Sequence, residues 1–302
     1  PLLRVAGKLY QAKFPKLDPE QTETIAANLL GPDGAKRIAS VNDHDGSYQI
    51  PEAERLRVNI FRQRGHYSIV LRVIPTTIPS FESLNLPEVL KQIALEPRGL
   101  VLVTGITGSG KSTTLAAMID HINATVGKHI LTIEDPIEFL HTDKHSSINQ
   151  REIGSDSDDF ASALRAGLRQ DPDIILVGEI RDVPTVNTAI KAAETGHVVF
   201  STLHTVDAVS TINRVLDMYP AEQNQQLRIQ LAANLKATIS QRLVTCKDGR
   251  TVVPVVEVMR VTSTIREYIE KPEHTHKIKD AIEAGRSQYG MQTFDQHLTE
   301  LY

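Results

Sequence analysis

One segment of the chain has residue types and spacing that could hold the phosphates of a nucleotide. Residues 105–112 read Gly-Ile-Thr-Gly-Ser-Gly-Lys-Ser, the spacing of a phosphate-binding loop. In such a loop, glycines let backbone N–H groups curl around a phosphate, lysine offsets its charge and serine ligates magnesium. The predicted binding residues are Gly105, Ile106, Thr107, Gly108, Ser109, Gly110, Lys111, Ser112 and Thr113. We therefore expect ATP and Mg²⁺ as cofactors.

Carboxylate and imidazole side chains follow other apolar runs in the same half of the chain. Glu134 and Glu138 follow one run, Glu179 follows the next, and His204 follows a third. Ligands of open α/β sheets bind beyond the carboxyl ends of the strands, so these side chains are expected to converge on the nucleotide. Glu179 suits magnesium binding together with Ser112, and Glu138 suits orienting or deprotonating the attacking water.

Each of these residues also has a structural interpretation. A lone carboxylate at a strand end, such as Glu134, more often caps or pairs with a neighbouring charge. A lone histidine such as His204 is more often structural than a sensor of the γ-phosphate or of a neighbouring subunit. The phosphate-binding loop raises the weight of the functional interpretation for both residues, and it leaves Glu134 as the second candidate for the catalytic carboxylate.

The elements that must position these residues follow from apolar periodicity. From residue 100 onward, short apolar runs alternate with helical patterns, which predicts a mostly parallel, doubly wound α/β sheet. The expected strands are 100–104, 129–133, 174–177 and 198–201, and the expected helices are 111–124, 158–168 and 183–194. Leu227, Leu231, Leu235, Ile239 and Leu243 fall every four residues, which predicts one helical stripe.

The first part of the chain is predicted to be a smaller α+β domain. Asp18 and Pro19 are start signals for a helix over 18–30. Strands are expected over 2–5, 47–50, 56–62 and 67–74. Because the chain opens at Pro1 inside an expected strand, a further N-terminal stretch is expected before it. We place the domains at 1–74 and 88–302, the second ending in a helical part, with a linker at 75–87.

Composition narrows the classes of protein. At 302 residues with 40% hydrophobic content, the chain can bury a core in each of two domains. The net charge of −4 argues against nucleic acid as a partner. Cys246 is the single cysteine, which excludes an intramolecular disulfide and fits a reducing cytoplasm. No apolar run is long enough for an integral membrane segment.

Four motifs in order resemble the type II/IV secretion ATPase superfamily. They are Gly-Ser-Gly-Lys-Ser-Thr at 108–113, Thr-Ile-Glu-Asp-Pro-Ile-Glu at 132–138, Asp-Pro-Asp-Ile-Ile-Leu-Val-Gly-Glu-Ile-Arg-Asp at 171–182 and Ser-Thr-Leu-His-Thr at 201–205. Within the superfamily, residues 57–65, 220–223 and 289–296 are similar to the retraction ATPases of type IV pili. The similarity covers nearly the whole chain.

The resemblance implies a RecA-like ATPase domain with a smaller, PAS-like N-terminal domain. It implies a Walker A motif at 105–112, an aspartate box at 134–138 with Glu138 as the catalytic glutamate, a Walker B motif at 174–179 and a histidine box at 202–205. It also implies a homo-hexameric ring in the cytoplasm, peripheral to the inner face of the cytoplasmic membrane. The partner would be an inner-membrane pilus platform protein, with the extension ATPase as a further candidate.

Arginines of the N-terminal domain are candidates to complete a neighbouring subunit's site. Arg57 and Arg62 lie in one expected hairpin, and Arg72 follows on the next strand. An arginine from a neighbour is a recurring source of positive charge at the γ-phosphate, and a ring would supply the neighbour. Arg62 and Arg64 share one strand face and are expected to project outward together. Arg62 is favoured, and a solvated strand face is the alternative.

Other functions remain open at this stage. An extension or type II secretion ATPase of the same superfamily typically carries a four-cysteine zinc insert, which a single cysteine argues against. A nucleotide switch that binds guanine would carry Asn-Lys-x-Asp, which is absent. A DNA-pumping ATPase is possible on fold grounds, and the acidic balance lowers its weight. Near the C-terminus, residues 264–271 resemble the retraction motif and keep Ile265 and Arg266 of it.

Overall fold

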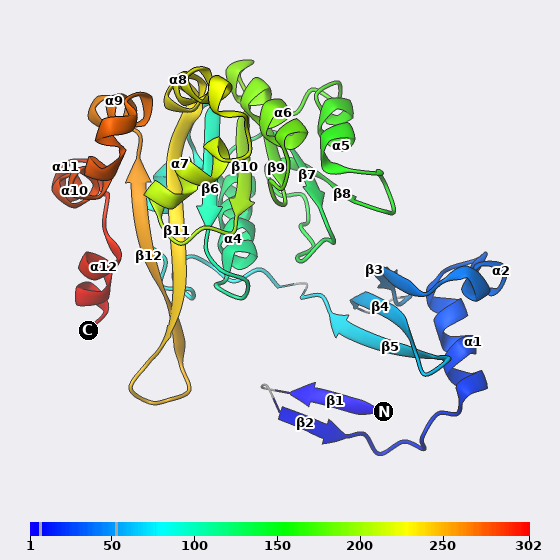
Figure 1. Cartoon of the computed structure of the whole chain (residues 1–302). Helices are drawn as coiled ribbons and strands as arrows, with labels where there is room; N and C mark the ends of the chain where they lie inside the picture. The colour runs from blue at the N-terminus through cyan, green and yellow to red at the C-terminus, as the bar shows by residue number, and fades with distance from the viewer. Residues whose placement is uncertain (6–7, 52–53, 76) are drawn as a thin grey trace. The chain divides into compact units, whose positions relative to one another are not determined.

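The computed structural model describes residues 1–5, 8–51, 54–75 and 77–302 (Figure 1). The chain divides into two compact units, Pro1–Pro75 and Thr76–Tyr302. Each unit has a hydrophobic core of its own. Phe81 and Leu86, which fall in the expected linker, are buried in a core of the second unit. Within the described residues, every helix is too short or too polar to reach across a lipid bilayer.

The first unit is built on an antiparallel sheet in the order β3-β4-β5. Helix α1 covers one face of this sheet, and its Ala26 belongs to the same core as Val58 and Ile60 of β4. The elements of the unit are β1 (Leu2–Val5), β2 (Lys8–Gln11), α1 (Pro19–Leu29), α2 (Gly34–Arg37), the 3₁₀ turn η1 (Ile38–Ser40), β3 (Asp43–Gln49), β4 (Arg55–Gln63) and β5 (His66–Val73). The predicted α+β character is therefore present.

Helix α1 begins where the sequence signals predict. The Asp18 carboxylate accepts a hydrogen bond from the Gln21 backbone N–H at 2.8 Å. The Gln21 side-chain oxygen in turn accepts from the Asp18 N–H at 3.0 Å. This reciprocal pair satisfies two backbone donors at the helix start, and Pro19 occupies the first turn, where its missing N–H costs nothing.

The second unit contains a seven-stranded sheet in the order β12-β11-β6-β10-β9-β7-β8. Its strands are β6 (Gly99–Thr104), β7 (His129–Glu134), β8 (Ser147–Glu152), β9 (Ile174–Val177), β10 (Val198–Leu203), β11 (Leu235–Thr245) and β12 (Val252–Arg260). Only β11 and β12 pair antiparallel among the neighbours in this sheet, and all other neighbours are parallel. The predicted, mostly parallel sheet is confirmed.

Helices cover both faces of this sheet, with a separate core under each layer. Leu102 of β6 joins the core beneath α5 to α10, whereas the adjacent Val103 joins the core beneath α3 and α4. Burial on both faces explains why β6 is apolar throughout. The helices are α3 (Val89–Ala94), α4 (Lys111–Thr125), α5 (Phe160–Gly167), α6 (Val183–Glu194), α7 (Ala208–Leu216), α8 (Asn224–Asn234), α9 (Ser263–Glu270), α10 (Ile278–Ala284), α11 (Arg286–Tyr289) and α12 (Phe294–Leu301), with 3₁₀ turns η2 (Ala221–Gln223) and η3 (Pro272–Lys277).

The prediction of one helical stripe over 227–243 is wrong in its second half. Helix α8 ends at Asn234, and Leu235, Ile239 and Leu243 lie on strand β11. A spacing of four residues keeps side chains near one face of a helix and also on one face of a strand, because four is twice the strand period. The spacing of Ile239 and Leu243 therefore fits either kind of element, whereas a register shift after Leu235 puts that side chain in the core on the other face of the sheet. Strand β8 was not predicted because it is a polar edge strand.

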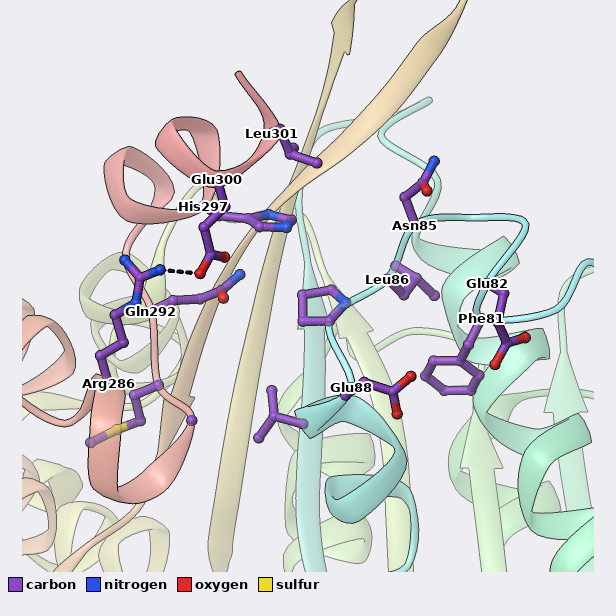
Figure 2. Close-up of a pocket in the computed structure, with 14 residues that line it drawn as sticks. Phe81, Glu82, Asn85, Leu86, Glu88, Arg286, Gln292, His297, Glu300 and Leu301 are labelled. Atoms are coloured by element: carbon purple, nitrogen blue, oxygen red, sulfur yellow. Dashed lines mark hydrogen bonds and ion pairs between the residues drawn. The ribbon is translucent and has the colours of Figure 1, made fainter.

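The edge of the sheet at β12 is closed by side chains from the C-terminal segment. The His297 Nδ1 accepts a hydrogen bond from the Val256 N–H at 2.9 Å. The Gln292 side chain donates to the Val256 carbonyl at 2.8 Å. Both residues lie beside a cavity of about 580 Å³ whose other wall includes Phe81 and Leu86 (Figure 2). These bonds satisfy both backbone polar groups of Val256, which would otherwise be unpaired on an edge strand.

This arrangement predicts a pH-dependent contribution to stability. His297 must be neutral at Nδ1 to accept a hydrogen bond, and burial lowers the pKa of His297. A lowered pKa in the folded state means that stability is present above the ordinary value near 6.5 and is lost as the pH falls. In His297→Asn, the Oδ1 atom can accept the same bond without titrating. Between about pH 7.5 and about 5.5, the wild type should lose roughly 1 kcal/mol more unfolding free energy than this variant. Denaturation experiments at each pH give the unfolding free energies. If these free energies change by the same amount in the two proteins, the assignment is contradicted.

Candidate active site

The predicted phosphate-binding loop lies between strand β6 and helix α4, as the motif requires. Gly108 and Gly110 have φ values of 81° and 87°, in the left-handed region that glycine adopts without strain. Ile106, Thr107 and Gly108 are exposed, so the rim of the loop is accessible from solvent. Helix α4 begins at Lys111, which directs its N-terminal N–H groups toward the loop.

Lys111 is held inside the loop by backbone carbonyls. Its side-chain nitrogen donates to the Gly105 carbonyl at 2.8 Å and to the Ile106 carbonyl at 3.1 Å. The residue is 8% exposed, and burial lowers the pKa of Lys111 while the nearby charge of Glu138 opposes that shift. The lysine ammonium and the Glu138 carboxylate are thus close enough to interact electrostatically, although they lie far apart in sequence.

Parallel pairing brings the other predicted motifs to the same edge of the sheet. β10 lies directly beside β6, followed by β9 and then β7, all parallel. At their carboxyl ends, the Gly105 N–H donates to the Leu203 carbonyl at 3.3 Å, and the Gly178 N–H donates to the Ile133 carbonyl at 2.8 Å. The strand order therefore places these loops at the same edge of the sheet.

Glu179 at the end of β9 connects three of these loops. Its carboxylate forms an ion pair with Arg181 and lies 3.3 Å from the Nε2 atom of His204. Arg181 also reaches Asp135, with 3.8 Å between Nη1 and Oδ2. The Glu179 side chain is 14% exposed, so its charge is compensated within a partly buried cluster. Motif analysis did not select Arg181. Its position in the same loop, two residues after Glu179, is the sequence feature that could have identified it as a site residue.

His204 lies within this cluster and near the phosphate-binding loop. Burial first, and then the positive charges of Lys111 and Arg181, lower the pKa of His204. The imidazole is therefore mostly neutral at neutral pH, and it can exchange hydrogen bonds with Glu179 or with a bound phosphate.

Glu134 and Glu138 occupy different environments within the aspartate box. The Glu134 carboxylate accepts hydrogen bonds from the Thr132 hydroxyl at 2.6 Å and the Gln150 side chain at 3.1 Å. Burial raises the pKa of Glu134. Glu138, by contrast, is exposed and interacts with Lys111. The geometry thus favours a structural role for Glu134, whereas the Glu138 carboxylate is accessible to a water molecule that it could orient or deprotonate.

The proposed magnesium ligands present oxygen donors of the kind that Mg²⁺ prefers. Ser112 is the second residue of α4 and contributes a hydroxyl, while Glu179 contributes a carboxylate. Within residues 1–5, 8–51, 54–75 and 77–302, no group of three or more His, Cys, Asp or Glu side chains is arranged to hold a metal. Mg²⁺ at such sites is bound through one or two protein oxygens together with substrate phosphates. The donor set therefore fits a nucleotide-bound ion.

The arginines of the first unit do not share one outward face. Leu56, Val58 and Ile60 are buried in the core, so Arg62 belongs to the same, core-facing side of β4. Its guanidinium donates to the Val41 carbonyl at 3.2 Å and also binds residues 39 and 67. Arg62 is still exposed to solvent, but its guanidinium is held by hydrogen bonds within its own unit, so it does not project freely as expected.

Arg57 and Arg72 occupy the other face of this sheet. They lie directly opposite each other in the register of β4 and β5. Arg57 is half-buried and Arg72 is exposed. Like charges in a cross-strand pair destabilise a sheet unless an anion lies nearby. The pair is therefore better suited than Arg62 to meet a negatively charged group from outside the unit.

Comparisons with known proteins show which family this chain belongs to. The family model described as type II/IV secretion system protein matches residues 43–301. A twitching motility protein of Neisseria gonorrhoeae is 44% identical, with 100% of this chain and 80% of the relative covered. A type IV pilus retractation ATPase, PilT, of Pseudomonas aeruginosa is 45% identical, with 100% and 87% covered. A crystal structure of the pilus retraction motor PilT with bound ADP has a TM-score of 0.90 and 43% identity, covering 100% of this chain and 86% of that one.

The two aspartate-box carboxylates give a direct test of the site. In Glu138→Gln, the protein should still bind ATP and should lose about 10²-fold or more in turnover, because no carboxylate remains to act on water. The matched variant Glu134→Gln keeps one side-chain oxygen that can accept from both Thr132 and Gln150, and it loses only the longer bond from the Glu138 backbone N–H at 3.5 Å. It should therefore change thermal stability little and should keep more activity than Glu138→Gln. Nucleotide binding and steady-state ATPase rates measure the difference. If Glu138→Gln turns over at the wild-type rate, Glu134 becomes the catalytic candidate.

Proposed function

Because this chain belongs to the type II/IV secretion system protein family, we propose that it is an ATP-driven motor that retracts type IV pili. The observation that carries the proposal is the buried Lys111 in its phosphate-binding loop, next to Glu138 and the Glu179 cluster. Similarity to retraction proteins extends over 100% of the chain, so it includes both compact units. ATP hydrolysis is the enzymatic activity of this arrangement.

The residues divide the work of hydrolysis among themselves. The loop N–H groups and Lys111 bind the β- and γ-phosphates, and Glu138 orients or deprotonates the attacking water. Ser112 and Glu179 would hold Mg²⁺, which neutralises phosphate charge when it is bound. His204 contacts the same carboxylate at 3.3 Å, so it can register whether the γ-phosphate is present. A change in this contact is the proposed first step in coupling hydrolysis to movement.

A ring of identical subunits would complete the site and transmit the work. We place Arg57 and Arg72 ahead of Arg62 as residues that reach the nucleotide of a neighbouring subunit, because the Arg62 guanidinium is occupied within its own unit. The assembly proposed is a homo-hexamer at the cytoplasmic face of the inner membrane. Its partners would be the pilus platform protein and the extension ATPase.

Helix α9 is proposed to serve pilus retraction without taking part in ATP hydrolysis. It contains the motif-like residues 264–271 except the last one, and it begins at a Thr262 cap. Ile265 is fully buried, whereas Arg266 on the same helix is exposed. Ile265 therefore holds the helix in place, and the exposed side that includes Arg266 is the part available to a partner. Of the alternative functions, an extension ATPase predicts the opposite pilus phenotype, a loss of pili on deletion.

A genetic test separates these functions. Deleting the gene in its own host should leave cells with excess pili that do not twitch, because extension continues without retraction. Complementation with Lys111→Ala should fail, since the uncompensated phosphate charge should lower ATP turnover by about 10²-fold or more. Complementation with Arg266→Ala should restore ATPase activity without restoring twitching. Pilus counts and twitching zones provide the measurement, and bald deletion cells would point to an extension motor.

Subunit mixing tests completion of the site by a neighbour. Arg57→Ala and Lys111→Ala proteins, each inactive alone, should regain part of the activity when their subunits exchange, because some interfaces then pair an intact loop with an intact arginine. An arginine of this kind contributes about 10³- to 10⁵-fold in rate. Arg64→Asn is the matched control, since it removes a charge from the turn of the same hairpin, where φ is 53°. Full activity of the Arg57→Ala protein would remove Arg57 from the mechanism.

A further inference from the structure

A buried glutamine contacts the phosphate-binding loop from a neighbouring strand. Gln241 lies on β11, one residue after Ser240, which pairs with Thr104 at the end of β6. It is 3% exposed, although its side chain carries one strong acceptor and two donors. It belongs to none of the motifs that define the site, and it is far from the loop in sequence. A buried amide in this position must find partners within the protein.

Both ends of the Gln241 amide are satisfied by the loop and its helix. The Nε2 atom donates to the Ser109 carbonyl at 2.7 Å. The Oε1 atom accepts from the Thr114 hydroxyl at 2.7 Å, and Thr114 is 1% exposed. One side chain thus links the loop backbone to the first turn of α4. Such a link restricts how far the loop can shift relative to the helix that follows it.

The bond to Ser109 has a consequence for the next N–H group. A trans peptide unit is planar, so its C=O and N–H point in opposite directions. Because the Ser109 carbonyl is held toward Gln241, the Gly110 N–H of the same peptide unit points away from Gln241. Backbone N–H groups on the inside of such a loop are the groups that bind phosphate oxygens. Gln241 therefore acts on the orientation of a phosphate-binding donor without touching the phosphate.

The same residue limits which side chains the loop can contain. A Cβ atom placed on Gly110 would lie 2.7 Å from the Gln241 Nε2 atom. A Cβ atom on Gly105 would lie 2.5 Å from the Gln241 carbonyl oxygen. Both distances are shorter than carbon can approach these atoms. At Gly110 the Gln241 side chain itself leaves no room for a Cβ atom, whereas at Gly105 the Ser109 hydroxyl and the Gln241 backbone both exclude one.

We propose that Gln241 is a positioning residue for nucleotide binding, which holds the Ser109–Gly110 peptide unit in the orientation that presents its N–H to phosphate. The inference rests on the role of this loop in the proposed function. It adds a strand outside the four motifs to the machinery of the site. A purely structural glutamine would contribute to folding stability alone, whereas a positioning residue changes nucleotide affinity beyond its effect on stability.

Variants at both ends of the amide separate these possibilities. Gln241→Met keeps the length of the side chain and removes both bonds. Gln241→Glu keeps an acceptor for Thr114, but an ionised carboxylate cannot donate to the Ser109 carbonyl. Thr114→Val removes one bond from the other side, and Thr114→Ser keeps the hydroxyl. Thr238→Val is the matched control: Thr238 is fully buried on the same strand, and its hydroxyl has no hydrogen-bond partner in the described part of the chain.

The experiment measures dissociation constants for a fluorescent ADP analogue and for MgATP, together with kcat, KM and thermal midpoints. Gln241→Met and Gln241→Glu should weaken binding of both nucleotides by about 10- to 100-fold and raise KM more than they lower kcat. Thr114→Val should weaken binding less, and Thr114→Ser should retain more affinity than Thr114→Val. Thr238→Val should bind nucleotide like the wild type. If Gln241→Met does not fold, two comparisons still test the effect on nucleotide affinity: Gln241→Glu against the wild type, and Thr114→Val against Thr114→Ser.

Two outcomes would overturn the proposal. Nucleotide affinities of the folded Gln241 variants equal to that of the wild type would make Gln241 structural only. A loss of affinity in Thr238→Val matching that in Gln241→Met would show that any change on β11 disturbs the loop. Failure of the wild-type protein itself to bind ADP or MgATP would contradict the proposed function, which distinguishes that failure from failure of this inference.

Discussion

Parallel pairing of β6, β10, β9 and β7 brings the carboxyl ends of these strands to one edge of the sheet, where the groups of the candidate site are attached. The strands are held in this order by burial on both faces, since alternate residues of β6 enter separate cores. A sheet buried on two sides tolerates little change in register, because a slip of one residue would exchange the two apolar faces. The spacing of the site therefore depends on packing far from the nucleotide.

Charge compensation at this edge is shared among several loops. Lys111 is buried in its own loop with Glu138 near it, while the charge of Glu179 is balanced by Arg181 and its carboxylate also contacts the imidazole of His204. Partly buried charges are costly without partners, so removing one member of such a cluster affects the others. This linkage gives the site a physical means of responding to phosphate: an added negative charge must redistribute contacts that span three loops.

The first unit illustrates how the face of a strand decides the role of an arginine. On β4, Arg62 follows the buried residues of the core face and is fixed by carbonyl groups, whereas Arg57 lies on the opposite face beside Arg72. The alternation of side chains was evident from the sequence, but which of the two faces would be covered by α1 was not. For that reason, Arg57 and Arg72 replace Arg62 as the favoured candidates to reach a neighbouring subunit.

The sequence by itself determined the phosphate-binding loop, the alternation of strands and helices and the cap of α1, because these depend on local spacing and on residues close together in the chain. It did not distinguish α8 from β11, since a four-residue spacing satisfies both periods, and it did not reveal the polar edge strand β8. Only the tertiary structure decided that Glu134 binds Thr132 and Gln150, and that Gln241 binds the Ser109 carbonyl. Most such contacts join residues distant in sequence, and strand order and packing bring them together.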